Sequence, residues 1–296
     1  MNTDIIETAA KLEITGEHEH WTEIIQPKTK LLDLRLGELW RYRDLVMMFV
    51  RRDFVTNYKQ TILGPVWFFL QPLLTSFTYI LIFGRVAKLS TDGLPMIVFY
   101  LAGITIWNYF SETLTKTATV FKDNAQMFGK VYFPRLTMPF SIVISNLVRF
   151  CIQLFLFLII WFYYLLQTDS IHPNIYILLI PILVIVMGLL ALGFGMIISA
   201  MTTKYKDLIF LLTFGIQLLM FATPVIYPLS SIPGKYKAII LANPITPIVE
   251  TFRYGFLGSG TFSWSYLAYS LVTTIVILLL GTIVFNRVEK SFTDTV

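Results

Sequence analysis

The chain has 296 residues, of which 56% are hydrophobic and only 14% are charged, and its mean hydropathy is +0.69. A water-soluble domain of this composition could not cover its surface with polar groups, so the composition excludes a soluble protein and indicates a membrane protein. The formal net charge is +5, but no nucleic-acid-binding motif accompanies it, and we expect no nucleic-acid partner.

The N-terminal part of the chain is polar. Residues 1–32 carry six carboxylates before residue 24 and lack the apolar core of a signal peptide, so we expect a cytoplasmic tail. Residues 33–60 are predicted to form an amphipathic helix in the cytoplasmic membrane interface, because Leu39, Tyr42, Val46, Phe49 and Val50 share one helical face while charged residues interrupt any continuous apolar run. A soluble amphipathic helix packed on the tail is the alternative.

Six apolar segments are predicted to cross the bilayer. A helix needs about 20 apolar residues to cross about 30 Å of hydrocarbon. The predicted spans cover 63–84, 95–119, 136–166, 175–200, 208–227 and 265–286. We therefore expect an all-α integral membrane domain over 61–287, followed by a short cytoplasmic tail over 288–296.

Basic residues predict the orientation of these spans. An even number of spans places both termini on one side of the membrane, and sixteen Lys and Arg residues fall on that side against five on the other. The positive-inside rule therefore places both termini in the cytoplasm. The net positive charge is explained by this orientation next to anionic lipid headgroups.

Two predicted spans carry stripes of polar side chains. The stripe of the first span is Trp67, Gln71, Thr75 and Thr78, with the aromatic Tyr79 beside it. The stripe of the fifth span contains Thr213 and Gln217, with the aromatic Phe210 and Phe214 beside it. Amides and hydroxyls facing lipid would be costly, so both stripes should face protein or water. They could be hydrogen-bonding glue between helices or the lining of a polar channel. Amides beside aromatic planes would suit sugars, whose rings combine hydroxyls with apolar C–H faces.

Ionisable side chains occur inside the second and third predicted spans. Glu112 and Lys116 are spaced i, i+4, and Arg149 lies at a similar distance on the far side of the connecting turn. Glu112 and Arg149 could therefore face each other across a helical hairpin. Charges inside a membrane are functional candidates, and a structural ion pair of Glu112 with Arg149 or Lys116 is the alternative.

The cytoplasmic connection 122–135 is predicted to be a short amphipathic element. Its candidate contact residues are Asn124, Phe128, Lys130, Tyr132, Phe133 and Arg135. Exposed aromatic side chains with arginine nearby are typical of protein interfaces, so we predict a docking surface here.

The stretch 228–263 is too long and too apolar for a simple loop. Its four prolines break helices, so we expect two short helices, about 235–242 and 246–257, in a re-entrant or interfacial hairpin on the outer side. Broken structure at membrane depth is tolerated only where it is buried in protein or lines a cavity. The hairpin is therefore a candidate outer gate.

Catalytic and cofactor motifs are missing. The pair His18 and His20 has no third metal ligand nearby, and neither Gly129-Lys130 nor Gly234-Lys235 has the earlier glycine of a phosphate-binding loop. We expect a chain that is not an enzyme and holds no cofactor or metal. Any ATP and Mg²⁺ would then be bound by a partner subunit.

Three blocks of the sequence resemble ABC-2-type permeases that export polysaccharides. The first block reads Arg51-Arg52-Asp53-Phe54, then Tyr58-Lys59-Gln60-Thr61-Ile62-Leu63-Gly64-Pro65-Val66-Trp67 and Gln71-Pro72-Leu73. The second reads Asn124, Lys130-Val131-Tyr132-Phe133-Pro134-Arg135 and Pro139, and the third reads Asn243-Pro244 and Phe252-Arg253. The resemblance covers roughly 38–290.

The resemblance implies a homodimer of permeases in the bacterial cytoplasmic membrane, bound to two copies of a cytoplasmic P-loop ATPase. The interfacial helix and 122–135 would contact the ATPase, the latter as a coupling helix. Spans one and five of both protomers would line a channel for an undecaprenyl-linked glycan such as O-antigen, capsule or teichoic acid. Arg51, Arg52 and Lys59 are the candidates for attracting its pyrophosphate at the cytoplasmic mouth.

Three other functions are weighed against this one. An ABC-2 exporter of drugs or small lipids would have a narrower and less aromatic lumen. A membrane-embedded glycosyltransferase would need paired acidic residues, whereas the outer loops offer only Asp92, Asp169 and Glu250, widely separated. A passive channel would not need a coupling element.

Overall fold

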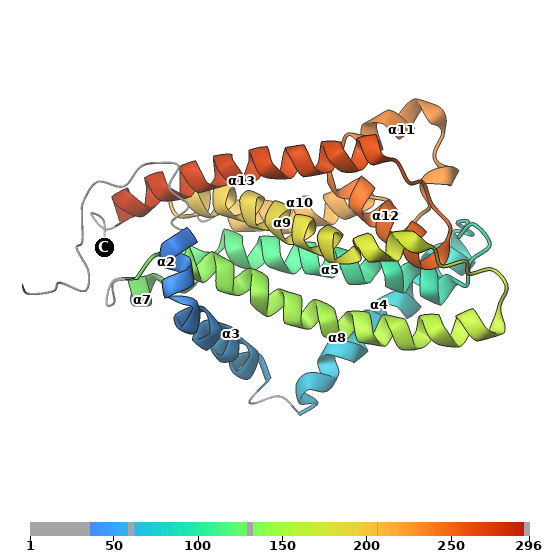
Figure 1. Ribbon diagram of the computed structural model, residues 1–296, viewed down its shortest axis with the longest axis horizontal. Helices are drawn as coiled ribbons and strands as arrows, with labels where there is room; N and C mark the ends of the chain where they lie inside the picture. Colours follow the sequence, from blue (N-terminus) through green and yellow to red (C-terminus); the bar gives the residue numbers. More distant parts are fainter. Residues whose placement is uncertain (1–35, 59–61, 129–132, 206, 293–296) are drawn as a thin grey trace, which may run out of the picture. The chain divides into compact units, whose positions relative to one another are not determined.

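The computed structural model describes residues 36–58, 62–128, 133–205 and 207–292 (Figure 1). Within these ranges the regular structure is helical throughout, without a β-strand. The predicted tail 1–32 and the candidate residues Lys59, Lys130 and Tyr132 lie outside the described residues.

Four helical segments of the described chain are long and apolar enough to cross a membrane. They are Gly64–Val86, Thr137–Gln167, Ile175–Thr202 and Trp264–Val288. The first combines a 3₁₀ turn with α4 (Trp67–Tyr79) and a π-helical end (Ile80–Val86). The others are α8 (Thr137–Gln167), α9 (Ile180–Thr202) after a 3₁₀ turn, and α13 (Trp264–Phe292).

The two remaining predicted spans differ from these four. Helix α5 (Met96–Ala118) is 23 residues long, but its polar side chains make it less apolar. Helix α10 (Leu208–Phe221) has 14 residues, or about 21 Å at 1.5 Å per residue. It ends before the predicted limit of 227 because Pro224 disfavours the helical conformation at the preceding residue. The count of six spans therefore stays a prediction.

Helix α9 packs between α5 and α13. Glycines allow this close approach: a Cβ atom on Gly281 of α13 would lie 2.5 Å from the carbonyl oxygen of Gly193, and one on Gly195 would lie 2.5 Å from Cβ of Thr117 on α5. Small residues at a crossing let helix backbones approach closely. We call α5, α9 and α13 the trunk.

Two short helices follow α10. Helix α11 (Gly234–Leu241) has no buried residue, whereas α12 (Ile245–Leu257) is buried along nearly its whole length. Both begin and end within one residue of the predicted limits. Helix α12 packs against α5, α9 and α13, so its broken chain path is covered by protein.

At the other end of the trunk, α2 (Leu36–Arg41) precedes α3 (Arg43–Tyr58), which packs against α8 (Figure 1). Val46, Phe49 and Val50 are buried on the predicted face of α3, while Trp40 is 71% exposed. The apolar face of α3 is thus covered by protein. The connection after α5 forms two single-turn helices, α6 (Val120–Asp123) and α7 (Ala125–Phe128).

Candidate functional site

The exposed faces of the long helices differ in polarity. Between their ends, α8, α9 and α13 expose apolar side chains, for example Ile159, Ile185 and Val276. Helices α4 and α10 instead expose the amides of Gln71 and Gln217 among their apolar neighbours. An amide without a hydrogen-bond partner is costly in hydrocarbon, so these two faces require a polar or protein neighbour.

Some polar groups in the stripe of α4 have a hydrogen-bond partner within the helix, and others do not. Trp67, Gln71 and Thr78 are exposed, and Thr75 is half-buried. The hydroxyls of Thr75 and Thr78 each donate at 2.9 Å to the carbonyl oxygen four residues earlier, so both are satisfied inside the helix. Among the described residues, the Gln71 amide has no such partner.

The stripe of α10 follows the same pattern. Its exposed members are Phe210, Thr213, Phe214 and Gln217. Thr213 donates to the carbonyl oxygen of Ile209 at 3.0 Å, whereas Gln217 has no hydrogen-bond partner in the described part of the chain. Within the described part of the chain, neither glutamine therefore joins helices through a hydrogen bond.

Helices α4 and α10, which carry the two stripes, contact each other at the C-terminal end of α4. Tyr79 donates through its hydroxyl to the sulfur of Met220 on α10 at 3.5 Å. The ring of Tyr79 also packs edge-on against Tyr100 of α5, with centroids 6.1 Å apart. Tyr79, predicted to lie beside the stripe, therefore joins α4, α10 and the trunk.

Two aromatic residues of the predicted docking element, Phe128 and Phe133, are turned inward. Phe128 and Phe133 are 7% and 5% exposed; their rings stack with centroids 5.6 Å apart, and Phe133 also contacts Phe49 of α3 at 5.7 Å. Arg135 is 8% exposed, and its guanidinium lies 5.6 Å from the Phe128 ring centroid. The expectation that these aromatics are exposed is wrong, because the pattern shows an amphipathic element but not which face is covered.

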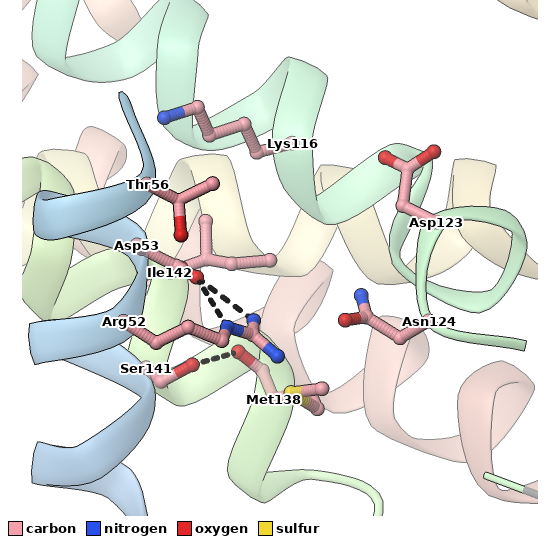
Figure 2. A pocket seen from close by; sticks show the side chains of 9 residues that line it. All are labelled: Arg52, Asp53, Thr56, Lys116, Asp123, Asn124, Met138, Ser141 and Ile142. Carbon is pink, nitrogen blue, oxygen red and sulfur yellow. Dashed lines mark hydrogen bonds and ion pairs between the residues drawn. The ribbon is translucent and has the colours of Figure 1, made fainter. Parts of the chain in front are cut away.

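A pocket of about 380 Å³ lies between α3, the end of α5, the α6–α7 connection and the start of α8 (Figure 2). Arg52 enters it from α3 and donates to Asp53 at 2.8 and 3.0 Å. Lys116 and Asn124 line the same pocket, and Lys116 has no ion-pair partner among the described residues. Arg51 is exposed. Of the two predicted headgroup residues that the structure describes, Arg51 and Arg52, it places Arg52 at the pocket.

The intramembrane charges come together between α5 and α8. Arg149 donates through Nη1 to Oε2 of Glu112 at 2.8 Å, and its guanidinium carbon lies 5.7 Å from the ring centroid of Phe68 on α4. Of the pairings left open by the sequence, the structure contains Glu112–Arg149.

Two amide contacts that the sequence analysis missed flank this pair. Asn108 donates to Gln153 at 3.4 Å, and the buried Asn146 donates to Thr113 at 3.2 Å. The polar spacing on α8 could have revealed Asn146 and Gln153, because residues 146, 149 and 153 are three and four positions apart.

A second charge pair, also missed, lies in α12. Glu250 and Arg253 of α12 are each 1% exposed, and Nη1 of Arg253 lies 3.2 Å from Oε1 of Glu250. Arg253 also donates to the carbonyl oxygen of Val225 at 3.1 Å and lies over the ring of Phe99 at 4.0 Å. A Cβ atom on Gly103 would come within 2.7 Å of that carbonyl oxygen, so α5 approaches the pair through a glycine.

Glu250 is also held by the segment that follows α12. Its Oε2 accepts hydrogen bonds from the amide and hydroxyl of Thr261 at 3.1 and 3.4 Å. Burial raises the pKa of the Glu250 carboxyl, although Arg253 and Thr261 act in the opposite direction. The i, i+3 spacing of opposite charges in an apolar stretch was the signal that could have identified this pair.

Several proteins of known class are similar to this chain over most of its length. The O-antigen export system permease protein RfbA of Klebsiella pneumoniae is 28% identical over 252 residues, 85% of this chain and 94% of the relative. The protein of the same name from Myxococcus xanthus is 27% identical over 88% of this chain and 98% of the relative. The polysialic acid transport protein KpsM of Escherichia coli is 24% identical over 81% of this chain and 92% of the relative.

The family assignment rests on a match to a family model. The family described as ABC-2 type transporter matches residues 44–257, which run from α3 through the exposed stripes and the docking element to the end of α12. Because this match covers well over half of the chain and contains every candidate site described above, the chain is a member of the ABC-2 type transporter family.

Proposed function

We propose that this chain is the membrane subunit of an ATP-driven exporter that moves lipid-linked polysaccharide across the bacterial cytoplasmic membrane. The similar proteins named for O-antigen export and polysialic acid transport support the substrate class. The observation that carries the proposal is the exposure of Gln71 and Gln217, which have no hydrogen-bond partner among the described residues, beside aromatic rings on α4 and α10.

A homodimer would give these amides a polar neighbour. Two copies that face each other through α4 and α10 would enclose a channel between them, where water or sugar hydroxyls satisfy Gln71 and Gln217. The exposed rings of Trp67, Phe210 and Phe214 would stack on the apolar faces of sugar rings. A lumen made only of apolar side chains would suit drugs or small lipids better.

Energy would come from a separate subunit, because the sequence contains no phosphate-binding loop. Two copies of a cytoplasmic P-loop ATPase would bind ATP and Mg²⁺ and dock on 122–135. Among the described residues of this element, Lys122, Asp123 and Gln126 have exposed side chains. They would meet the ATPase together with Asn124, Lys130 and Tyr132. Phe128, Phe133 and Arg135 would support the element from beneath.

The substrate headgroup would enter from the cytoplasmic side. Arg51, Arg52 and Lys59 would attract its pyrophosphate, and the position of Arg52 beside the unpaired Lys116 in the pocket of Figure 2 supports this placement. Six spans with both termini in the cytoplasm would place this pocket on the side of the ATPase.

The proposal is tested by replacing the two amides. We expect Gln71→Leu combined with Gln217→Leu to lower glycan export, measured as surface polysaccharide in cells, while the protein inserts and assembles normally. The control is Ile275→Leu on the exposed apolar face of α13, which should export like the wild type. Normal export by the double variant would exclude the channel role of the two stripes, and a wild-type complex that moves drugs or small lipids but no glycan would refute the substrate class.

A further inference from the structure

Helix α3 contacts both the docking element and α4, in each case through a phenylalanine. Phe49 contacts Phe133 at 5.7 Å between ring centroids, and Phe133 in turn stacks on Phe128 of α7. Five positions further along α3, Phe54 stacks on Phe68 of α4 with centroids 5.6 Å apart and ring planes at 26°. The docking element and the exposed stripe of α4 are thus joined by one helix.

The contact between Phe54 and Phe68 is built into the protein interior. Phe68 is 5% exposed and is one of only three buried residues described on α4. Arg149 lies near the same ring and is held in turn by Glu112 of the trunk. The ring of Phe68 therefore contacts an aromatic group of α3 and a cation of α8, and both contacts depend on its flat face.

The position of Phe68 determines how α4 presents its stripe. Trp67 precedes Phe68 directly, and Gln71 follows it by three residues, almost one helical turn. A rotation or shift of α4 at Phe68 would therefore move both exposed side chains.

We propose that α3 is a transmission element that couples the docking element 122–135 to α4, through Phe49–Phe133 at one end and Phe54–Phe68 at the other. The Phe54–Phe68 contact is kept throughout transport, so that α3 and the adjoining part of α4 move together, while Arg149 is a positioning residue for the Phe68 ring. This inference rests on the proposed export function and adds the route by which the partner acts on the channel face.

The first experiment separates coupling from folding. In the complex with the ATPase, we expect Phe54→Ala and Phe68→Ala to lower glycan export per ATP hydrolysed about tenfold, the effect of losing roughly one aromatic pair. Co-purification of the ATPase and the rate of ATP hydrolysis should stay close to the wild-type values. The two substitutions together should be no worse than Phe68→Ala alone, because Phe68→Ala already removes the contact with Phe54.

Matched variants keep this test specific. Val55→Ala changes an exposed neighbour on α3 and should leave export per ATP unchanged, and Phe68→Tyr should retain coupling because it keeps the ring. The inference is overturned if Phe54→Ala and Phe68→Ala leave export unchanged or lower hydrolysis and export in parallel. A wild-type complex that hydrolyses ATP without moving glycan would instead refute the proposed function.

A cross-link tests whether the contact persists. The chain has one cysteine, Cys151, which is exposed, so Cys151→Ser provides a cysteine-free background. We expect Phe54→Cys with Phe68→Cys to be uncoupled when reduced and to regain export when a short dithiol reagent joins the two positions. Export that stays low after complete cross-linking would show that α3 and α4 separate during transport.

Discussion

At the scale of single residues, the charges of Glu250 and Arg253 hold together the segments that precede and follow α12. Arg253 bonds the carbonyl oxygen of Val225 after α10, and Glu250 bonds Thr261 before α13. Nearby, Asp92 from the α4–α5 loop accepts a hydrogen bond from Ser230 at 2.7 Å. Removing two charges from water is costly unless both are paired and hydrogen-bonded, so the geometry of these segments is tightly specified.

Breaking this pair should destabilise the protein strongly. We expect Glu250→Gln or Arg253→Gln to cost about 3–5 kcal/mol, because each leaves a buried charge without its partner. The double change Glu250→Leu with Arg253→Met should cost less than the sum of the two single changes. Thermal unfolding of the detergent-solubilised protein measures the loss of stability of each variant. Asp92→Asn, at an exposed position, is the control and should have a smaller effect; an unchanged unfolding temperature for Glu250→Gln would contradict the prediction.

At the scale of elements, the trunk depends on backbone contact between helices. Gly193 of α9 meets Gly281 of α13 closely enough that an added Cβ atom would touch backbone atoms on either side. By contrast, a Cβ atom on Gly215 of α10 would meet no atom within 4 Å. The trunk is therefore tightly packed, whereas α10 has room around its glycine.

Substitution of these glycines should separate the two cases. Gly193→Val and Gly281→Val should each destabilise the protein by about 1–3 kcal/mol or more, since overpacking forces the helices apart. Gly215→Ala should be neutral or stabilise α10 by up to about 1 kcal/mol through helix propensity. The unfolding temperatures of the three variants test this prediction. Equal effects at positions 215 and 281 would show that the contact between α9 and α13 is not tightly packed.

At the scale of the whole molecule, the closely packed trunk contrasts with the exposed faces of α4 and α10. None of the residues of α10 is buried, and the exposed face of this helix carries the unpaired Gln217. In a membrane, exposed apolar residues are satisfied by lipid, but an unpaired amide is not. The fold of one protomer is therefore consistent with a functional unit that contains a second copy.

A second copy should be detectable through Gln217. In the Cys151→Ser background, Gln217→Cys should form cross-links between two copies in native membranes, because α10 of each copy would face the shared channel in the proposed dimer. Ile275→Cys, on the exposed face of α13, should remain monomeric under the same conditions. Cross-linking at position 275 but not at 217 would place the contact between copies on a different face.

Much of the architecture could be predicted from the sequence, because membrane helices follow from local composition. The long apolar segments of α4, α8, α9 and α13 and the short helices α11 and α12 lie within a few residues of their predicted limits, since apolar length and proline positions are local properties. The face of α3 with Val46, Phe49 and Val50 was likewise readable from its spacing.

Only the tertiary structure decided which groups have partners. Helical spacing placed Thr75 and Thr213 in polar stripes, but their bonds to their own backbone leave only Gln71 and Gln217 in need of a partner. The burial of Phe128 was equally hidden from the sequence, and the spacing of Glu250 and Arg253 could indicate their pairing but not their burial. Composition and periodicity describe one helix at a time, whereas burial and hydrogen bonding depend on what the neighbouring helices place against it.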